Sequence, residues 1–153
     1  MARYQVLLVD DNPVARRVVR QVLEKESQLR ICGEADDGKE ALDKAKLLQP
    51  DIVMFDEPDS GLDPVRTALL GELILEIHRD MMDEAKAKGR THLPTFCVIT
   101  HDIMSARRVA EHLCVLWKGR IVESGPAEDL FASENPFVRQ FLSGESAGPL
   151  GME

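Results

Sequence analysis

The segment "PDIVMFDEPDSGLDP", residues 50–64, decides how this chain of 153 residues folds. Its apolar run Ile52–Phe55 has the length and continuous hydrophobicity of a strand that is covered on both faces. The run ends at Asp56, so we expect this carboxylate at the carboxyl edge of a sheet, where ligands bind in open α/β folds. Asp63 suits a helix N-cap and Pro64 suits the first helical position. The segment therefore predicts a buried strand, an acidic loop and the start of a helix.

Similar strands and helices extend to both sides of this segment. Further short apolar runs are Val6–Val9, Leu29–Cys32, Phe96–Ile99 and Leu113–Trp117. The helical stripes between them are Val14, Val18 and Val22; Ala41, Leu42, Ala45 and Leu48; and Leu70, Ile74, Ile77 and Met81. The last stripe belongs to a helix of about 24 residues. This alternation predicts a three-layer, doubly wound α/β domain with a parallel sheet and right-handed crossovers.

Length and composition limit the class of protein. A chain of 153 residues with 44% hydrophobic content is the size of one domain, so we expect residues 1–153 to form a single domain. The net charge of −8 predicts no nucleic-acid partner and no attraction to anionic membranes. Three cysteines inside apolar runs, with no leader or membrane-spanning run, favour a soluble protein of the reducing cytoplasm.

Three carboxylates are expected to meet at the carboxyl edge of the sheet. Asp10 and Asp11 follow the first strand, and Asp56 ends the third. Their mutual repulsion raises some of their pKa values unless a divalent cation neutralises them, and Mg²⁺ suits such oxygen ligands. The alternative is that these aspartates only cap helices, since Asp11 or Asn12 before Pro13 would suit a helix start.

Residues 4–56 resemble a response-regulator receiver domain. The resemblance rests on the double aspartate after the first strand, on "GEADDGKEAL" and on "PDIVMFD". It implies that Asp10 and Asp11 hold Mg²⁺ and that Asp56 accepts phosphate. Receivers also use a hydroxyl after the fourth strand and a lysine after the fifth, for which Thr100 and Lys118 are the candidates. We expect Lys118 to lie instead in a hairpin turn with Gly119.

Residues 51–153 resemble the Walker B to C-terminal part of an ABC transporter ATPase of the lipid-importing type. The resemblance rests on "DIVMFDEPDSGLDP", "TFCVITHD" and "VLWKGRIVESGPAEDLF", and the lipid-importing type rests on "NPFVRQFLSGESAGPLGME". It implies that Asp56 coordinates Mg²⁺, that Glu57 polarises water and that His101 contacts the γ-phosphate. No G-x-x-x-x-G-K-[ST] segment and no "LSGGQ" signature occur, so we expect neither ATP binding nor ATPase activity.

Asp56 belongs to both resemblances, which places the junction between them within residues 51–57. The receiver-like half is then 1–56 and the ATPase-like half 51–153. Because the Walker A strand of the ATPase is absent, the remaining strands are expected in the flavodoxin-like order 2-1-3-4-5. Ile121–Glu123 is expected as an added antiparallel edge strand.

Three hypotheses about function follow. The favoured one is an engineered or recombined chimera that tests fold compatibility and has no evolved catalytic or signalling function. In it no residue is catalytic, no cofactor is required, and Asp56, Glu57, Thr100, His101 and Lys118 are vestigial. The alternative is a vestigial Mg²⁺-dependent phosphoacceptor using Asp56, and the least favoured is an ATP-binding fragment.

Overall fold

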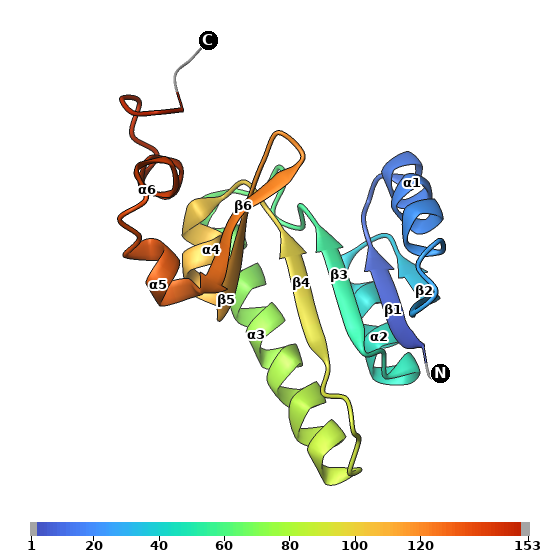
Figure 1. The fold of residues 1–153 in the computed structure, drawn as a ribbon. Helices are drawn as coiled ribbons and strands as arrows, with labels where there is room; N and C mark the ends of the chain where they lie inside the picture. The colour runs from blue at the N-terminus through green and yellow to red at the C-terminus, as the bar shows by residue number, and fades with distance from the viewer. Residues whose placement is uncertain (1–2, 151–153) are drawn as a thin grey trace. The chain divides into compact units, whose positions relative to one another are not determined.

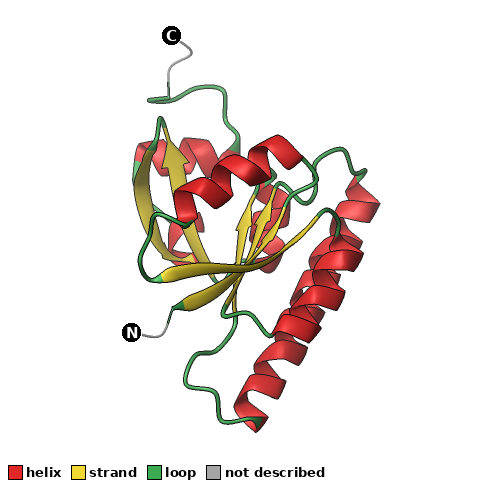
Figure 2. Cartoon of the chain, turned by 90° about the vertical axis from the view of Figure 1, so that its right-hand side faces the viewer, coloured by secondary structure: helices red, strands yellow, loops and turns green. Residues whose placement is uncertain are grey.

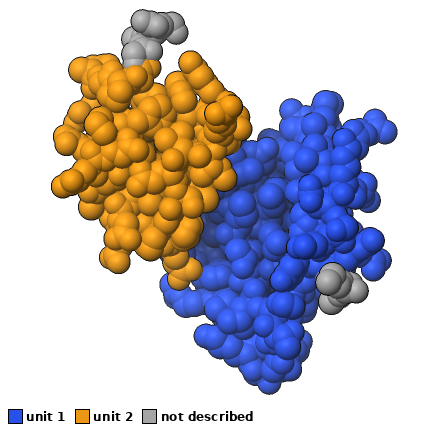
Figure 3. Space-filling model, viewed as in Figure 1, with its two compact units in different colours: residues 1–101 blue, residues 102–153 orange. Residues whose placement is uncertain are grey.

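The computed structural model describes residues 3–150 as alternating strands and helices (Figure 1). The elements are β1 (Tyr4–Val9), α1 (Pro13–Leu23), β2 (Leu29–Ala35), α2 (Gly38–Leu48), β3 (Ile52–Asp56), α3 (Pro64–Ala87), β4 (Thr95–Ile99), α4 (Ile103–Val109), β5 (His112–Trp117), β6 (Arg120–Pro126), α5 (Ala127–Phe131) and α6 (Pro136–Ser143). They form two compact units, residues 1–101 and 102–153, which Figure 3 colours separately.

The first unit contains a parallel sheet in the order β2-β1-β3-β4. β1 lies between β2 and β3, with Val6 opposite Ile52 and Val9 opposite Phe55. β3 continues the sheet to β4, with Asp56 opposite Ile99. Four strands in this flavodoxin-like order confirm the predicted doubly wound α/β class.

Helices cover both faces of this sheet. The chain moves from β1 to β2 in one direction and from β2 through β3 to β4 in the other, so right-handed crossovers place α1 opposite α2 and α3. On the α2 and α3 face, Leu7 and Val53 of the sheet are fully buried. Figure 2 shows the long helix α3 running beside the strands. The apolar residues that these elements bury together form the core of the first unit, as predicted for a three-layer domain.

The predicted inward stripe of α1 is wrong. Val14, Val18 and Val22 are all more than half exposed, and Val14 reaches 70%. The helix instead turns its neighbouring stripe, which includes Val19 and Leu23, toward partial burial. Both stripes have the i, i+4 spacing of an amphipathic helix, so periodicity alone does not decide which one faces the sheet.

The predicted start and end of α3 are confirmed. The Asp63 side chain accepts hydrogen bonds from the backbone N–H groups of Val65 and Arg66, and Pro64 occupies the first turn. The helix has 24 residues, as its pattern predicts. It ends before Gly89, whose φ of +63° is readily available only to glycine.

The second unit is built on a β-hairpin. β5 and β6 are antiparallel and joined by Lys118 and Gly119, which both have positive φ values. Such a two-residue turn matches the twist of paired strands, and the predicted hairpin is confirmed. A smaller core consists of Val115 with Leu130, Val138 and Leu142 of the closing helices.

The position of β5 differs from the prediction. The order 2-1-3-4-5 is correct for its first four members, but β5 pairs with β6 in a separate two-stranded sheet among the described residues. The predicted edge strand at Ile121–Glu123 is real, though it pairs within this hairpin. The pairing with β6 uses one edge of β5, and the other edge pairs with no strand among the described residues. The expectation of one domain over residues 1–153 stays a prediction.

Within residues 3–150, none of the helices combines the length and the apolar character that crossing a bilayer would require.

Candidate functional site

The register of β1 and β3 places Asp10 and Asp56 next to each other. Val9 lies opposite Phe55, so the residues that follow them, Asp10 and Asp56, reach the carboxyl edge of the sheet together. Asp10 is only 6% exposed. One of its oxygens, Oδ1, accepts a hydrogen bond of 2.8 Å from the backbone N–H of Asn12. The edge therefore carries a buried carboxylate with a partly buried one beside it.

This arrangement raises the pKa of Asp56. Burial is the largest cause, because it disfavours the charged carboxylate, and the negative charges of Asp10 and Glu57 act in the same direction. A hydrogen bond with the Asp10 side chain adds to the shift. The predicted repulsion between carboxylates is thus present at Asp56. A cation placed here would relieve it, and Mg²⁺ commonly uses one or two carboxylates together with water.

The third predicted ligand, Asp11, is exposed. Across residues 3–150, His, Cys, Asp and Glu side chains form no group of three or more that could hold a metal ion. The structure therefore brings Asp10 and Asp56 together and does not add Asp11 to them. The pair fits a water-rich Mg²⁺ site better than an all-protein cage, and metal binding stays a prediction.

Thr100 lies directly after β4, where a receiver-like hydroxyl is expected. Its hydroxyl donates to the carboxylate of Asp59, at 2.8 Å from Oδ2 and 3.1 Å from Oδ1. Asp59 is 9% exposed and belongs to the loop between β3 and α3. This contact ties the loop to the end of β4. Sequence reasoning missed Asp59, because its only signal is an aspartate in an acidic loop that also contains Glu57 and Asp63.

Glu57 and His101 are brought together as a pair. The His101 Nδ1 atom lies 3.2 Å from Oε1 of Glu57, and both side chains are largely exposed. Glu57 has a φ of +44°, and its backbone N–H donates to the carbonyl oxygen of Ile99 at 2.7 Å. The resemblance to an ATPase implies that both residues act near a γ-phosphate. Here they form a solvent-facing contact with each other.

Lys118 belongs to the second unit. It occupies the first turn position between β5 and β6, with a φ of +46°. Its Nζ atom lies 5.8 Å from the centre of the Trp117 ring, within cation–π range. The expectation that Lys118 lies in a hairpin turn is confirmed.

One segment has nearly the spacing of a phosphate-binding loop. Residues 33–40, "GEADDGKE", join β2 to α2, but Glu40 stands where such a loop needs a hydroxyl. The Asp37 side chain accepts from the Glu40 N–H at 2.8 Å, and the Glu40 side chain accepts from the Asp36 N–H at 2.8 Å. These carboxylates occupy the N–H groups at the start of α2 and repel anions. The segment is therefore a capped helix start.

Comparisons with known proteins find both resemblances. The family model of the response regulator receiver domain matches residues 6–58. The chain is 41% identical over 126 residues to "Probable ribonucleotide transport ATP-binding protein mkl" of Mycobacterium tuberculosis (strain ATCC 25618 / H37Rv), covering 80% of this chain and 32% of that protein. It is 38% identical over 110 residues to "Intermembrane phospholipid transport system ATP-binding protein MlaF" of Escherichia coli (strain K12), covering 72% and 37%.

A solved structure with a similar fold is the signal receiver domain of the putative response regulator NarL from Mycobacterium tuberculosis. It has 20% identity and a TM-score of 0.47, and the match covers 72% of this chain and 82% of that one. The chain spans about a third of the length of the curated transport relatives. Because the match to the transport protein covers 80% of this chain, it must include part of residues 6–58. The receiver and ATPase likenesses therefore overlap in sequence.

Proposed function

We propose that this chain is a recombined, engineered α/β protein in which a receiver-like and an ATPase-like half share one fold, without evolved catalysis or signalling. The observation that carries the proposal is the end of the receiver match at residue 58, two residues after Asp56. Glu57 lies at the end of this match, and most of the loop to α3 and His101 lie beyond it. A junction within residues 51–57 keeps β3 intact as a strand that suits both halves.

The incomplete receiver machinery supports this proposal. Thr100 donates to Asp59, and Lys118 lies in a hairpin turn of the other unit. Glu57 adds negative charge beside Asp56, which disfavours a phosphate dianion at that carboxylate. The hydroxyl of Thr100 is thus already engaged by Asp59, and Lys118 forms part of a two-residue turn.

The incomplete ATPase machinery supports it equally. No G-x-x-x-x-G-K-[ST] segment occurs in the sequence, and the nearest spacing, residues 33–40, carries carboxylates at its helix start. A nucleotide would lack the backbone cradle, the lysine and the hydroxyl that hold its phosphates. We therefore propose a non-enzymatic protein that requires no cofactor and has no nucleic-acid or membrane partner. Its expected location is the cytoplasm.

The test consists of two parallel assays, one with a phosphodonor and one with ATP. Purified chain is incubated with Mg²⁺ and acetyl phosphate and examined by intact-mass spectrometry, and ATP hydrolysis is followed in parallel. We expect no phosphoryl adduct, no phosphate release above buffer, and no change in the thermal midpoint with ATP, because a ligand of the native state must raise that midpoint. An adduct that disappears in Asp56→Asn would establish the receiver hypothesis instead.

A second candidate function, Mg²⁺ binding in a vestigial phosphoacceptor site, is favoured by the raised pKa of Asp56 beside Asp10. It predicts that millimolar Mg²⁺ raises the thermal midpoint of the wild type and not that of Asp56→Asn. Asp43→Asn, at an exposed position of α2, is the matched control and should respond like the wild type. Equal responses of all three proteins would contradict a site at Asp56. A nucleotide-dependent shift would favour the ATP-binding fragment.

A further inference from the structure

Helix α1 presents an apolar stripe to solvent. Its members, Val14, Val18 and Val22, are each more than half exposed. They follow one another at i, i+4 and i+8, so they form a continuous ridge along about 12 Å of the helix. Contiguous apolar side chains that face water often mark a site of interaction. The stripe on α1 is therefore a candidate contact surface.

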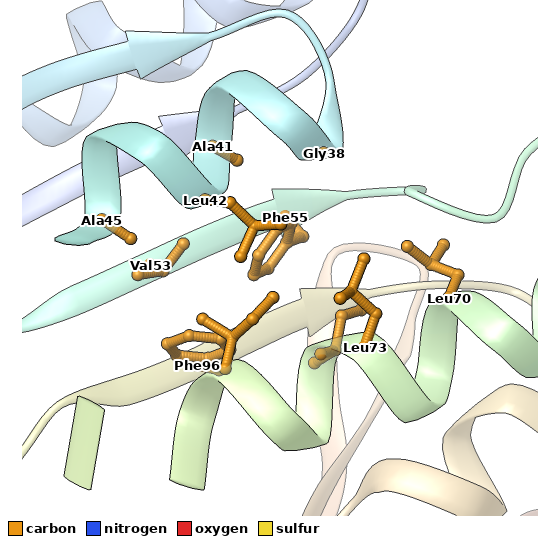
Figure 4. A pocket seen from close by; sticks show the side chains of 11 residues that line it. Gly38, Ala41, Leu42, Ala45, Val53, Phe55, Leu70, Leu73 and Phe96 are labelled. Carbon is orange, nitrogen blue, oxygen red and sulfur yellow. The ribbon is translucent and has the colours of Figure 1, made fainter. Parts of the chain in front are cut away.

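Helix α3 presents a second stripe with the same spacing. Val65 and Leu69 are more than half exposed, and Leu73 is 38% exposed. Leu73 also extends toward α2, where it lines the apolar contact between the two helices together with Leu70 (Figure 4). The stripes on α1 and α3 thus have equal length, and both are ridges of the i, i+4 type. Such ridges pack into each other's grooves in many helix pairs.

The charge beside the α1 stripe is positive. The helix contains three arginines and no carboxylate. Arg16 and Arg20 bind Glu34 of β2, and Arg20 also pairs with Glu24 at the end of the helix. Arg17 lies one turn after Val14, is exposed, and forms no ion pair within residues 3–150. It is therefore available to a carboxylate of another molecule.

The charge beside the α3 stripe is negative. Glu72 and Glu76 are exposed and follow Leu69 on the same side of the helix. Neither forms an ion pair in the part of the chain that the structure describes, whereas Arg66 in the first turn is paired with Asp63. The α1 and α3 stripes are thus complementary in charge as well as in spacing.

The fold prevents one chain from joining its own two stripes. α1 lies on one face of the sheet and α3 on the other. Pairing two copies through the same helix is also disfavoured, because two α1 stripes would bring arginine against arginine and two α3 stripes glutamate against glutamate. The complementary pairing is α1 of one copy with α3 of another.

We infer that this chain associates with itself head to tail, through the α1 stripe of one copy and the α3 stripe of the next. This contact is heterologous, so each pair keeps one free stripe of each kind and can add further copies. Two stripes of three side chains form a small interface, so the association is weak and depends on concentration. It uses no residue of the acidic edge and does not depend on the proposed function.

The experiment measures the average mass of the full chain by sedimentation equilibrium at protein concentrations up to about 1 mM. We expect the mass to rise with concentration and to pass that of a dimer. Val18→Glu on α1 and Leu69→Glu on α3 should each weaken association at least about tenfold, because the contact would bury an unpaired carboxylate. Leu47→Glu makes the same change at an exposed position of α2, outside both stripes, and should associate like the wild type.

An equal mixture of Val18→Glu and Leu69→Glu tests the pairing directly. The first variant keeps an intact α3 stripe and the second an intact α1 stripe, so the mixture should form a complex of two chains that grows no further. If Val18→Glu does not fold by circular dichroism, Val14→Glu at a more exposed position of the same stripe replaces it. The inference is overturned by a wild type that stays monomeric or stops at a dimer, by a folded variant of either stripe that associates like the wild type, or by a mixture that stays monomeric.

Discussion

Two strands of similar length and hydrophobicity differ sharply in burial. β1, with the sequence YQVLLV, buries Val6–Val9 completely or nearly so. β5, with the sequence HLCVLW, buries only Val115, and Leu116 is 60% exposed. β1 has a strand on each side and helices over both faces, whereas β5 has one antiparallel partner. Hydrophobic content therefore makes both segments strands, but their neighbours decide how much of each is buried.

The largest effect should come from the core of the first unit. Leu7 is fully buried, and Leu7→Ala should lower the free energy of unfolding by about 2–5 kcal/mol through lost burial and a residual cavity. Urea unfolding followed by circular dichroism measures the change. Leu47→Ala, at a position that is 80% exposed, is the control and should cost less than about 0.5 kcal/mol.

The same variant tests whether the two regions unfold as one domain. Trp117, the only tryptophan, lies in the second unit, so its fluorescence reports that unit while circular dichroism reports the whole chain. If residues 1–153 form a single domain as predicted, Leu7→Ala shifts both signals by the same amount. Separate transitions would contradict the single-domain prediction.

A smaller loss is expected in the core of the second unit. Val138 is fully buried among Val115, Leu130 and Leu142. Val138→Ala removes two methyl groups and should cost about 2–3 kcal/mol. Val122→Ala on the exposed side of β6 is the matched control. Equal unfolding midpoints of the two variants, measured by Trp117 fluorescence, would show that this core contributes little.

The next largest loss of stability is expected in the loop between β3 and α3, at the acidic edge of the sheet. Thr100→Val keeps the shape of the side chain but removes the hydroxyl that donates to Asp59. Leaving this buried acceptor without that donor should cost about 1–2 kcal/mol in chemical denaturation. Thr91→Val, at an exposed position before β4, should be close to neutral. A neutral Thr100→Val would mean that water replaces the hydroxyl at Asp59.

The smallest predicted effect on the free energy of unfolding is an increase, and it concerns Asp56. The folded-state pKa of Asp56 is raised, mainly by burial and by Asp10, so its protonated form favours folding. This contribution is complete below the unfolded pKa of about 3.9 and is lost as pH rises through the folded pKa. Asp56→Asn should therefore be more stable than the wild type at neutral pH and lose that advantage in acid. Thermal midpoints measured between acidic and neutral pH check this, and a constant difference would refute it.

The sequence predicts most of the first unit, because its signals are local. Continuous apolar runs identify β1 and β3, and Asp63 with Pro64 locates the start of α3 to the residue. The adjacency of Asp10 and Asp56 also follows from pattern, since parallel strands end at one edge. Periodicity does not determine which side of a helix faces the sheet, as the exposed stripe that begins at Val14 shows.

The remaining errors concern pairing over distance. The hairpin of β5 and β6 follows from the local turn at Lys118 and Gly119, whereas nothing in the apolar run of β5 shows whether its other edge pairs with β4. The hydrogen bond from Thr100 to Asp59 joins residues 41 positions apart, with no motif that relates them. Such contacts depend on the path of a loop, which composition and spacing do not encode.

The placement of β3 between β1 and β4 limits where two protein lineages can be joined. Each residue of β3 faces one helical layer or the other by alternation, while its backbone pairs with β1 on one side and β4 on the other. Inserting a single residue within β3 would exchange the two faces for the strand residues that follow it, whereas inserting two would restore them. Successful exchange between such lineages should thus obey a parity rule, in which even offsets survive and odd ones are lost.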